Sequence, residues 1–542
     1  MNHLATYDYI VFFIYFIIVA GYGYWVYHQK KSGGTNTKDY FLAEGSLTWW
    51  AIGASIIASN ISAEHFIGMS GSGFAMGLAI ASYEWMAAAT LIIVAVFFLP
   101  IYIKNKIYTM PQFLSGRYNN TVSTLMAVFW LLVYVFVNLT SIFFLGAIAI
   151  ETITGVPFTA CVIALGVFSV IITLGGMKVI GYTDVIQVFV LVVGGLITCY
   201  MALDMVSDKF NISTVLGALP VLRSEASEHF HMIFSKGDKF YNELPGMAVL
   251  VGGLWINNLN YWGCNQYIVQ RALGADLKTG RAGLIFAAFL KLLIPVIVVI
   301  PGICAYVLYK QGYFHKEMAD AAGNIKPDHA YPVLMNLLPT GLKGLAFAAL
   351  TAAIVASLAG KCNSIGTIFT LDIYKKFINK EASERKMVNV GRWSIIISSI
   401  IAIGIAPTLR SFDQVYQFIQ EYVGFISPGV FAIFLLGFFW KRTTSSAALT
   451  AALLTIPLST LFKFLPEVSQ GFIEPIPFLH RMSWVFCIIM ILMVIITLAD
   501  PKSKNNPQGL EIDAKMFKVS PSFIVASVII CGILAALYTV FW

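Results

Sequence analysis

The chain has 542 residues, of which 58% are hydrophobic and only 11% charged, and its mean hydropathy is +0.79. Soluble domains carry about 25% charged residues, and a water-soluble fold could not bury this much apolar surface, so that class is excluded. The formal net charge is +8. This excess is expected in cytoplasmic loops, and no basic stripe with interleaved aromatics indicates a nucleic-acid partner.

The apolar segments, taken in chain order, predict fourteen transmembrane helices, because about 20 apolar residues are needed to cross ~30 Å of hydrocarbon. The predicted ranges are 8–28, 50–73, 79–103, 122–150, 157–177, 184–204, 246–270, 281–309, 341–374, 390–409, 413–439, 446–464, 481–499 and 522–541. The first range carries its positive charge after the apolar run, unlike a signal peptide. We therefore expect an all-α integral membrane protein that forms one transporter domain over residues 1–542.

Every second connection between the predicted helices is basic. The basic residues are Lys30, Lys31, Lys38, Lys104, Lys106, Arg117, Lys178, Arg271, Lys278, Arg281, Lys375, Lys376, Lys380, Arg385, Lys386, Lys441, Arg442, Lys502, Lys504 and Lys515. Cytoplasmic loops carry an excess of lysine and arginine. The alternation therefore predicts that both termini lie outside the cytoplasm, with the chain in the cell (inner) membrane and the lipid bilayer as its surroundings.

Two predicted helices contain polar interruptions. One lies around Asn60 and Ser62 in 50–73, and the other around Asn257 and Asn258 in 246–270. A broken membrane helix frees carbonyl groups to line a cavity, so we expect unwinding near residues 58–65 and 256–262. The alternative is a tightly packed helix with small residues at its contacts.

The two interrupted helices are five helices apart and run in opposite predicted directions. This arrangement is typical of an inverted five-plus-five repeat. The first repeat would span residues 50–204 and the second 246–439. The helix at 8–28 would precede them, and three C-terminal helices at 446–541 would follow.

Ionisable residues within the membrane cost at least about 2.5–3.5 kcal/mol and usually mark function. The predicted helices contain Glu64, His65, Glu84, Lys291, Lys361 and Glu421. The repeat pairs the helices that carry Glu84 and Lys291, so these residues could meet near the midplane, in a ligand site or as a structural ion pair. A carboxylate, an ammonium, several amides and the ring of Tyr261 suit a polyol.

Five segments of the chain, namely 60–64, 66–73, 81–86, 183–188 and 420–422, read NISAE, FIGMSGSG, ASYEWM, TDVIQV and QEY. On these motifs the sequence resembles the sodium:solute symporter family, and within it the bacterial sodium/galactose cotransporters, over nearly its whole length. The resemblance implies a LeuT-type inverted-repeat fold and alternating access. It also implies sodium-coupled symport of a sugar, a hexose such as galactose or glucose.

The resemblance assigns roles to individual residues. The sugar would be contacted by Glu84, Asn258, Lys291 and Gln420, and Tyr261 would stack on its ring as an inner gate. The outer hydrophobic gate would be Met69, Tyr83 and Tyr416, and Asn60 and Asn138 would link the sugar site to the ion site. Sodium would be held by carbonyl groups of Ala58, Ile61 and Ala353 and the hydroxyl of Ser357, with Asp184 on its exit route.

The sequence departs from the family at two sugar positions. His65 stands where the family has a sugar-binding glutamine, and Ala87 where it has a serine. A site built to bond a hydroxyl discriminates strongly when that bond is lost, so the identity of the sugar stays open.

The ion site also departs from the family. Ala356 replaces one of two adjacent serines, and Lys361 follows where an apolar residue is usual. Lys361 is four residues after Ser357 and shares its helix face, so we expect its ammonium near Asp184 or the sodium pocket, where it could partly substitute for the ion. The alternative is that Lys361 extends to the membrane interface and sodium binds the remaining oxygens.

Other classes of function find little support. The chain has no Walker loop, no H-E-x-x-H and no G-x-S-x-G in a suitable context, so neither an enzyme nor an ATP-driven pump is indicated, and no organic cofactor is expected. A channel would line a continuous pore with repeated rings. A sodium-independent or proton-coupled sugar or polyol transporter, and a channel or sensor of the same fold, remain the alternatives.

Overall fold

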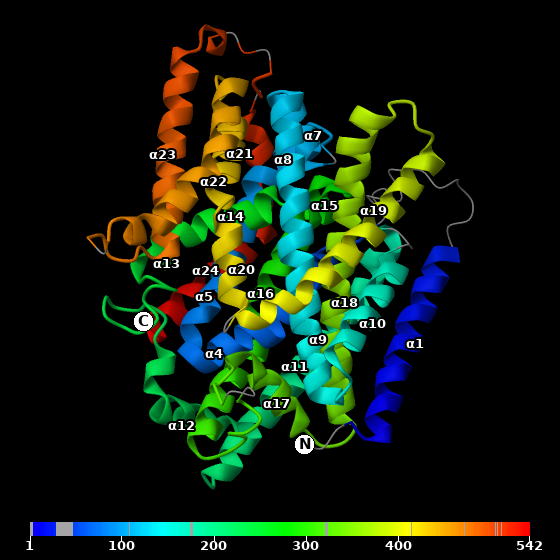
Figure 1. The fold of residues 1–542 in the computed structure, drawn as a ribbon, viewed down its shortest axis with the longest axis vertical. Coiled ribbons are helices and arrows are strands. Elements are labelled where there is room, and N and C mark those ends of the chain that lie inside the picture. Colours follow the sequence, from blue (N-terminus) through cyan, green and yellow to red (C-terminus); the bar gives the residue numbers. More distant parts are fainter. Residues whose placement is uncertain are drawn as a thin grey trace.

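The computed structural model describes residues 4–28, 47–107, 109–173, 177–319, 323–412, 415–470, 472–504, 506, 508–510 and 512–542. Within these residues the chain is helical and has no strand beyond an isolated bridge between Ala319 and Ile325. Figure 1 shows α1 at one edge of the helix bundle and α22 and α23 at the opposite edge. The expected all-α fold is confirmed.

Helical segments occupy all fourteen predicted ranges. In chain order these are α1 (Thr6–His28), α3 (Trp49–Asn60), η2 (Glu64–Met69), α4 (Ser70–Met76), η3 (Gly77–Ala81), α5 (Ser82–Ile93), η4 (Val94–Phe98), α6 (Leu99–Lys104), α8 (Asn120–Leu132), η5 (Val133–Leu139), α9 (Thr140–Thr154), α10 (Phe158–Thr173), α11 (Met177–Lys209), α13 (Met247–Val251), α14 (Gly253–Cys264), α15 (Gln266–Leu273), α16 (Leu277–Lys310), α18 (Leu342–Ile368), η9 (Phe369–Ile378), α19 (Glu384–Ile405), η10 (Ala406–Ser411), α20 (Val415–Gly424), α21 (Ser427–Phe439), α22 (Ser445–Val468), α23 (Phe478–Ala499) and α24 (Pro521–Val540).

Shorter helices form the connections between these segments. They are α7 (Met110–Arg117), η6 (Val215–Gly217), α12 (Ala218–Glu225), η7 (Ser227–Phe230), η8 (Pro327–His329), α17 (Ala330–Asn336), η11 (Pro501–Ser503) and η12 (Ala514–Phe517).

Fewer helices than fourteen pass as continuous membrane spans. In the described part of the chain ten are long and apolar enough, or eleven if the bent pair α20 and α21 is one span. The difference has a physical cause, because α3 and α14 stop after 12 residues each and α10 has only 16. The count of fourteen therefore stays a prediction.

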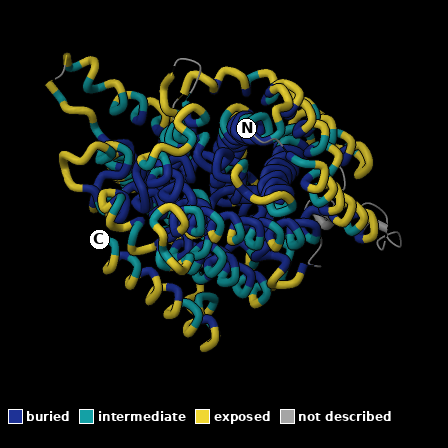
Figure 2. The backbone as a smooth tube through the Cα atoms, turned by 90° about the horizontal axis from the view of Figure 1, so that it is seen from below, coloured by how far each residue is buried: buried dark blue, intermediate teal, exposed yellow. Residues whose placement is uncertain are grey.

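The molecule keeps its apolar side chains on the outside as well as in the core. Figure 2 shows exposed residues around a buried centre. On α1, Tyr7 is 71% and Ile17 70% exposed, and on α24 Val528 is 64% exposed. Large exposed apolar surfaces mark membrane or partner contacts, and here they suit the hydrocarbon of a bilayer.

The break in the second predicted helix lies between α3 and η2. Ile61 is extended (φ −75°, ψ 124°). The hydroxyl of Ser62 accepts a hydrogen bond from the amide of Glu64 (3.1 Å), and the amide of Ser62 donates to Nδ1 of His65 (3.4 Å). These local bonds compete with helical ones, and the expected unwinding within residues 58–65 is confirmed.

The break in the seventh predicted helix is displaced from the expected place. The prediction of unwinding at 256–262 is wrong, because α14 is continuous through Asn258 and the extended residue is Asn265 (φ −102°, ψ 126°). Tyr134 fixes this break, since its hydroxyl donates to Oδ1 of Asn265 and accepts from the amide of Gln266 (3.1 Å). The polar run before it stays helical, and Asn257 and Asn260 donate to Gln420 and Ser427 on other helices instead of to their own backbone.

Two arginines assigned to loops are structural instead. Arg117 is buried and donates to the carbonyls of Gly437 (2.8 Å) and Trp440 (2.9 Å). Arg271 is also buried and donates to the hydroxyl of Ser59. Neither is a free loop charge, so the orientation argument depends on the other basic residues. Of these, Lys30, Lys31, Lys38 and the side chain of Lys178 lie outside the described residues.

Candidate functional site

A polar cavity lies beside both helix breaks. It is lined by Asn60, Glu64, His65, Tyr83, Glu84, Val133, Asn138, Asn257, Asn258, Tyr261, Trp262, Asn265, Tyr267, Tyr416, Ile419, Gln420 and Val423. Its volume is about 70 Å³, which is below the ~300–1,000 Å³ of small-molecule sites and gives room for only a few water molecules. A larger ligand requires this cavity to widen.

Lys291 and Glu84 form an ion pair at the edge of the cavity. The Lys291 ammonium donates to Oε2 of Glu84 and to Oδ1 of Asn60, and lies 4.9 Å from the centre of the Trp262 ring. The exposed fractions of Lys291 and Glu84 are 0% and 4%. The cluster joins α16, α5 and the end of α3, so three elements distant in sequence meet at one buried charge pair.

His65 is the second partner of Glu84. Its Nε2 lies 3.3 Å from Oε1 of Glu84, while its Nδ1 accepts from the amide of Ser62. In the neutral ring one nitrogen donates and the other accepts, so this arrangement puts the proton on Nε2 and directs it at the carboxylate. Ala87, the other departure, is buried and is not among the residues that line the cavity.

Tyr261 is held by its hydroxyl group. It accepts from Nδ2 of Asn60 (2.8 Å) and from the hydroxyl of Tyr267 (2.5 Å). Its ring meets Trp262 edge to face, with centroids 5.1 Å apart. Asn60 therefore connects Tyr261 to Lys291, two residues implied for the sugar site.

Amide groups form the wall opposite the ion pair. Nδ2 of Asn257 donates to Oε1 of Gln420 (3.2 Å), and Nε1 of Trp262 donates to Oδ1 of Asn258 (3.2 Å). The buried Nδ2 of Asn258 has no hydrogen-bond partner within the described residues. An unpartnered buried donor beside a cavity is consistent with a ligand that supplies the acceptor.

The aromatic residues of the expected outer gate come together in part. Tyr83 and Tyr416 both line the cavity, and their rings meet edge to face at 5.8 Å. Asn138 lines it from η5, a π-helical segment of the kind often found at functional sites. Met69 is buried in η2 and is not one of the lining residues.

The residues implied for sodium lie around the end of α3. Ala58, Ile61, Ala353 and Ala356 are buried there or on the helix beside it, α18. The hydroxyl of Ser357 donates to the carbonyl of Ser59 (3.0 Å) and accepts from the ammonium of Lys361 (2.8 Å). Lys361 is 1% exposed, so it does not extend to the interface, and its ammonium lies beside Ser357, a residue that the resemblance implies for sodium.

Asp184 occupies a separate buried cluster. Its Oδ2 accepts from the hydroxyl of Ser55 (2.5 Å) and lies 3.8 Å from NH2 of Arg271. Arg271 in turn donates to the Ser59 hydroxyl from Nε (3.0 Å) and NH2 (2.5 Å). Sequence reasoning missed Arg271 and the two serines, because nothing local shows that α15 returns the arginine to the end of α3.

Other residues of the polar cavity were also missed, although some of them belong to a pattern that the sequence shows. Asn257 and Trp262 belong to the polar run that predicted a site, and Asn265 follows it directly. Tyr267 carried no such signal, because its contact with Tyr261 depends on the break at Asn265. Glu421, next to Gln420, is instead paired with Arg481 (2.5 Å) outside the polar cavity.

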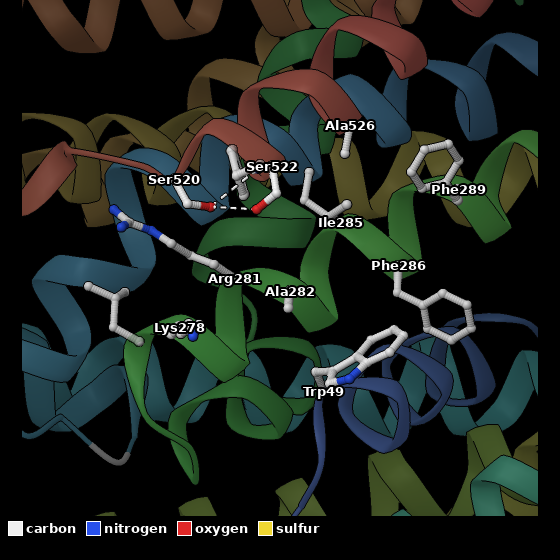
Figure 3. A pocket seen from close by; sticks show the side chains of 12 residues that line it. Trp49, Lys278, Arg281, Ala282, Ile285, Phe286, Phe289, Ser520, Ser522 and Ala526 are labelled. Carbon is white, nitrogen blue, oxygen red and sulfur yellow. Dashed lines mark hydrogen bonds between the residues drawn. The ribbon is translucent and has the colours of Figure 1, made fainter.

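A larger groove lies on the flank of α16 and has a different character. Figure 3 shows it between α16 and α24, with Trp49, Phe286 and Phe289 along it. Its volume is about 670 Å³. The guanidinium of Arg281 donates to the carbonyls of Met516 (2.9 Å) and Lys518 (2.7 Å). This groove contains none of the predicted site residues, so the smaller polar cavity is the better candidate for the functional site.

Known proteins similar to this chain include several cotransporters. A sodium/glucose cotransporter of Vibrio parahaemolyticus is 46% identical over 99% of both chains. Two proteins of Mus musculus, sodium/myo-inositol cotransporter and sodium/myo-inositol cotransporter 2, are 31% and 33% identical. They cover 92% and 83% of this chain, which spans 74% and 69% of their lengths.

Two solved structures share the fold. A Na⁺-coupled sialic acid symporter in a substrate-bound, outward-open state aligns with a TM-score of 0.76 and 21% identity, over 92% of this chain and 98% of that one. Mhp1, a nucleobase-cation-symport-1 family transporter in a closed conformation, aligns with a TM-score of 0.53 and 15% identity. The alignment covers 85% of this chain and 95% of that one. The family and the fold are those of transporters. Residues 40–455 match the profile of the sodium:solute symporter family, and with the extended identity to its cotransporters this shows that the chain belongs to that family.

Proposed function

We propose that this protein is a secondary active transporter that couples sodium entry to the uptake of a sugar by alternating access. The observation that carries the proposal is the buried cluster of Lys291, Glu84 and Asn60, beside a cavity at the two helix breaks. The unpartnered amide of Asn258 adds a donor to the same wall.

The chemistry of the cavity suits a neutral ring with many hydroxyl groups. Each hydroxyl both donates and accepts, and the cavity is lined by a carboxylate and several amides, with the Lys291 ammonium behind Glu84 and Asn60. The similar proteins named for sodium/glucose and sodium/myo-inositol cotransport have such rings as substrates. A hexose such as galactose or glucose is the proposed substrate, because the 46% identical protein covers the whole site.

The proposed architecture is fourteen membrane helices with a five-plus-five inverted repeat over 50–204 and 246–439. The segments that precede the two described breaks support it, because α3 and α14 have 12 residues each and both end at an extended residue. Both termini are proposed to face away from the cytoplasm, in the cell membrane. An alkaline phosphatase fusion at Trp542 should be active, and an inactive fusion would contradict this orientation.

Transport requires the small cavity to open toward one side at a time. Tyr83 and Tyr416 close one side, and Tyr261 with Tyr267 closes the other. A sugar hydroxyl that enters replaces one of the partners of Lys291, so substrate binding and the link through Asn60 to Tyr261 are coupled. Sodium, the second substrate, would bind carbonyls of Ala58, Ile61 and Ala353 with Ser357, and leave past Asp184.

Counterflow in proteoliposomes tests the proposal. Labelled glucose, galactose and myo-inositol would be offered with and without sodium, with Lys291→Ala as the matched inactive control. Saturable exchange and accumulation driven by a sodium gradient are expected. Accumulation without sodium would favour a sodium-independent or proton-coupled transporter, flux without saturation a channel, and binding without flux a sensor.

A further inference from the structure

Lys361 is an ammonium fixed inside the protein at the ion pocket. It donates to the hydroxyl of Ser357 (2.8 Å), and its nitrogen lies 4.8 Å from the centre of the Tyr267 ring. Its exposed fraction is 1%. Two elements hold it, because Ser357 shares α18 with Lys361 and Tyr267 belongs to α15.

The charged groups around Lys361 divide into two sets. Glu64 on η2 is the carboxylate that interacts with the ammonium, and it accepts from the hydroxyls of Ser141 (2.5 Å) and Ser62 (3.2 Å). Asp184 and Arg271 face each other at 3.8 Å. The carboxylate that faces Arg271 is therefore Asp184, whereas the hydrogen-bond partner of Lys361 is the hydroxyl of Ser357.

The packing of α18 leaves this position little freedom. A side chain at Gly360 would meet NH2 of Arg271 and Oγ of Ser59 at 2.9 Å each. A side chain here would therefore displace Arg271 or Ser59, so the glycine allows α18 to pack closely against the end of α3. Lys361 follows directly, and its ammonium bonds the Ser357 hydroxyl, which in turn donates to the carbonyl of Ser59 at the end of α3.

Sodium and the ammonium compete for the same oxygen. The Ser357 hydroxyl already gives its proton to Ser59 and accepts one from Lys361. Ala356 offers no second hydroxyl. Two cations at one oxygen repel each other strongly in a medium of low dielectric constant, so sodium can bind Ser357 only after the Lys361 side chain has left it.

We propose that Lys361 is a tethered cation that occupies the position of the coupling ion and lowers the affinity of the protein for sodium. The inference rests on the proposed sodium symport. The ammonium already bonds the Ser357 hydroxyl, which is the one side-chain oxygen proposed to hold sodium.

Equilibrium binding of radioactive sodium to the purified full-length protein in nanodiscs tests this without transport. Lys361→Met keeps the length of the side chain and removes its charge, and Lys361→Arg keeps the charge as the matched control. We expect Lys361→Met to bind sodium at least about tenfold more tightly than the wild type, and Lys361→Arg to remain weak. Equal affinity of wild type and Lys361→Met would overturn the proposal.

A second measurement covers the case in which Lys361→Met does not fold. A ligand that binds only the folded state stabilises it by RT ln(1 + [L]/Kd), so Tm begins to rise once the ligand concentration exceeds Kd. Because the wild type should bind sodium weakly, its Tm, measured at constant ionic strength with choline in place of sodium, should change little at low sodium concentrations. A rise in Tm that begins at low sodium concentrations would contradict the inference. Ser357→Ala in the Lys361→Met background should cancel the gain in affinity, which places the ion at that hydroxyl.

The two proposals fail in different experiments. If the wild type binds sodium tightly and also accumulates sugar on a sodium gradient, the proposal of a tethered cation is wrong and the proposal of sodium symport stands. If the Lys361→Met gain is found but no sugar is transported by either protein, the substrate is wrong and the tethered cation stands.

Discussion

The carboxylate of Glu84 on α5 and the ammonium of Lys291 on α16 form a buried ion pair, although 207 residues separate them in the chain. Asn60, at the end of α3, accepts from the same ammonium. Three helices are therefore tied together beside the polar cavity, where we propose that a sugar binds.

Loss of one member of this pair should remove substrate binding. Lys291→Ala and Glu84→Ala each leave a buried charge unpaired, a penalty of about 3–5 kcal/mol. We expect labelled galactose uptake to fall at least a hundredfold in each, while both variants still reach the membrane. The double variant should be more stable than either single variant in thermal unfolding, and normal uptake by both single variants would show that the pair is peripheral.

Two substitutions of Tyr261 distinguish the contribution of its ring to sugar binding from that of its hydroxyl group. Tyr261→Phe loses bonds with Asn60 and Tyr267 but keeps the ring, and a hydrogen bond contributes about 0.5–1.5 kcal/mol net. Sugar binding should weaken about tenfold, while Tyr261→Ala should lose most of it. Binding measured by equilibrium dialysis decides this, and an equal loss in both variants would mean that the hydroxyl alone matters.

His65 should act through the proton that it directs at Glu84. His65→Gln keeps a donor of similar reach and should retain sugar affinity within a few-fold, whereas His65→Ala should lose about tenfold, as expected for a hydrogen bond to a charged group. A competition series with glucose, galactose and myo-inositol would also show a change in preference among them. If His65→Ala binds all three as the wild type does, the histidine has no part in recognition.

Arg271 should be required for stability and for the shape of the ion pocket. Arg271→Met leaves Asp184 buried without its cation, so we expect a loss of about 3–5 kcal/mol, visible as a lower Tm in detergent. Arg271→Met with Asp184→Asn removes both charges and should recover much of this loss. If the double variant is no better than Arg271→Met, the bonds of Arg271 to Ser59 matter more than its charge.

Fold class and much of the candidate site follow from local patterns. Every predicted apolar range contains helices, because a helix satisfies its backbone groups within one continuous segment. The break at Ile61 was predictable because Ser62 and His65 offer side-chain partners for the backbone within four residues. Isolated charges such as Glu84 and Lys291 marked the site because an unpaired charge in hydrocarbon is costly.

The predictions that failed concern residues whose structure depends on partners far away in the chain. The second break falls at Asn265, where Tyr134 bonds the extended segment, and not at the asparagines of α14. Arg271 looked like a loop charge but is buried against Ser59 and Asp184.

The sequence by itself determined that this is a helical membrane transporter, which charges lie within the membrane, and where one helix breaks, since hydropathy and short-range hydrogen bonding act along the chain. Only the tertiary structure decided which charges pair. Glu84 meets Lys291, Asp184 meets Arg271, and Lys361 meets Ser357 beside Glu64. The reason is physical, because a buried charge is stabilised by whichever opposite charge or dipole the packing brings within a few ångströms, and that distance is set by the crossing of helices rather than by spacing in sequence.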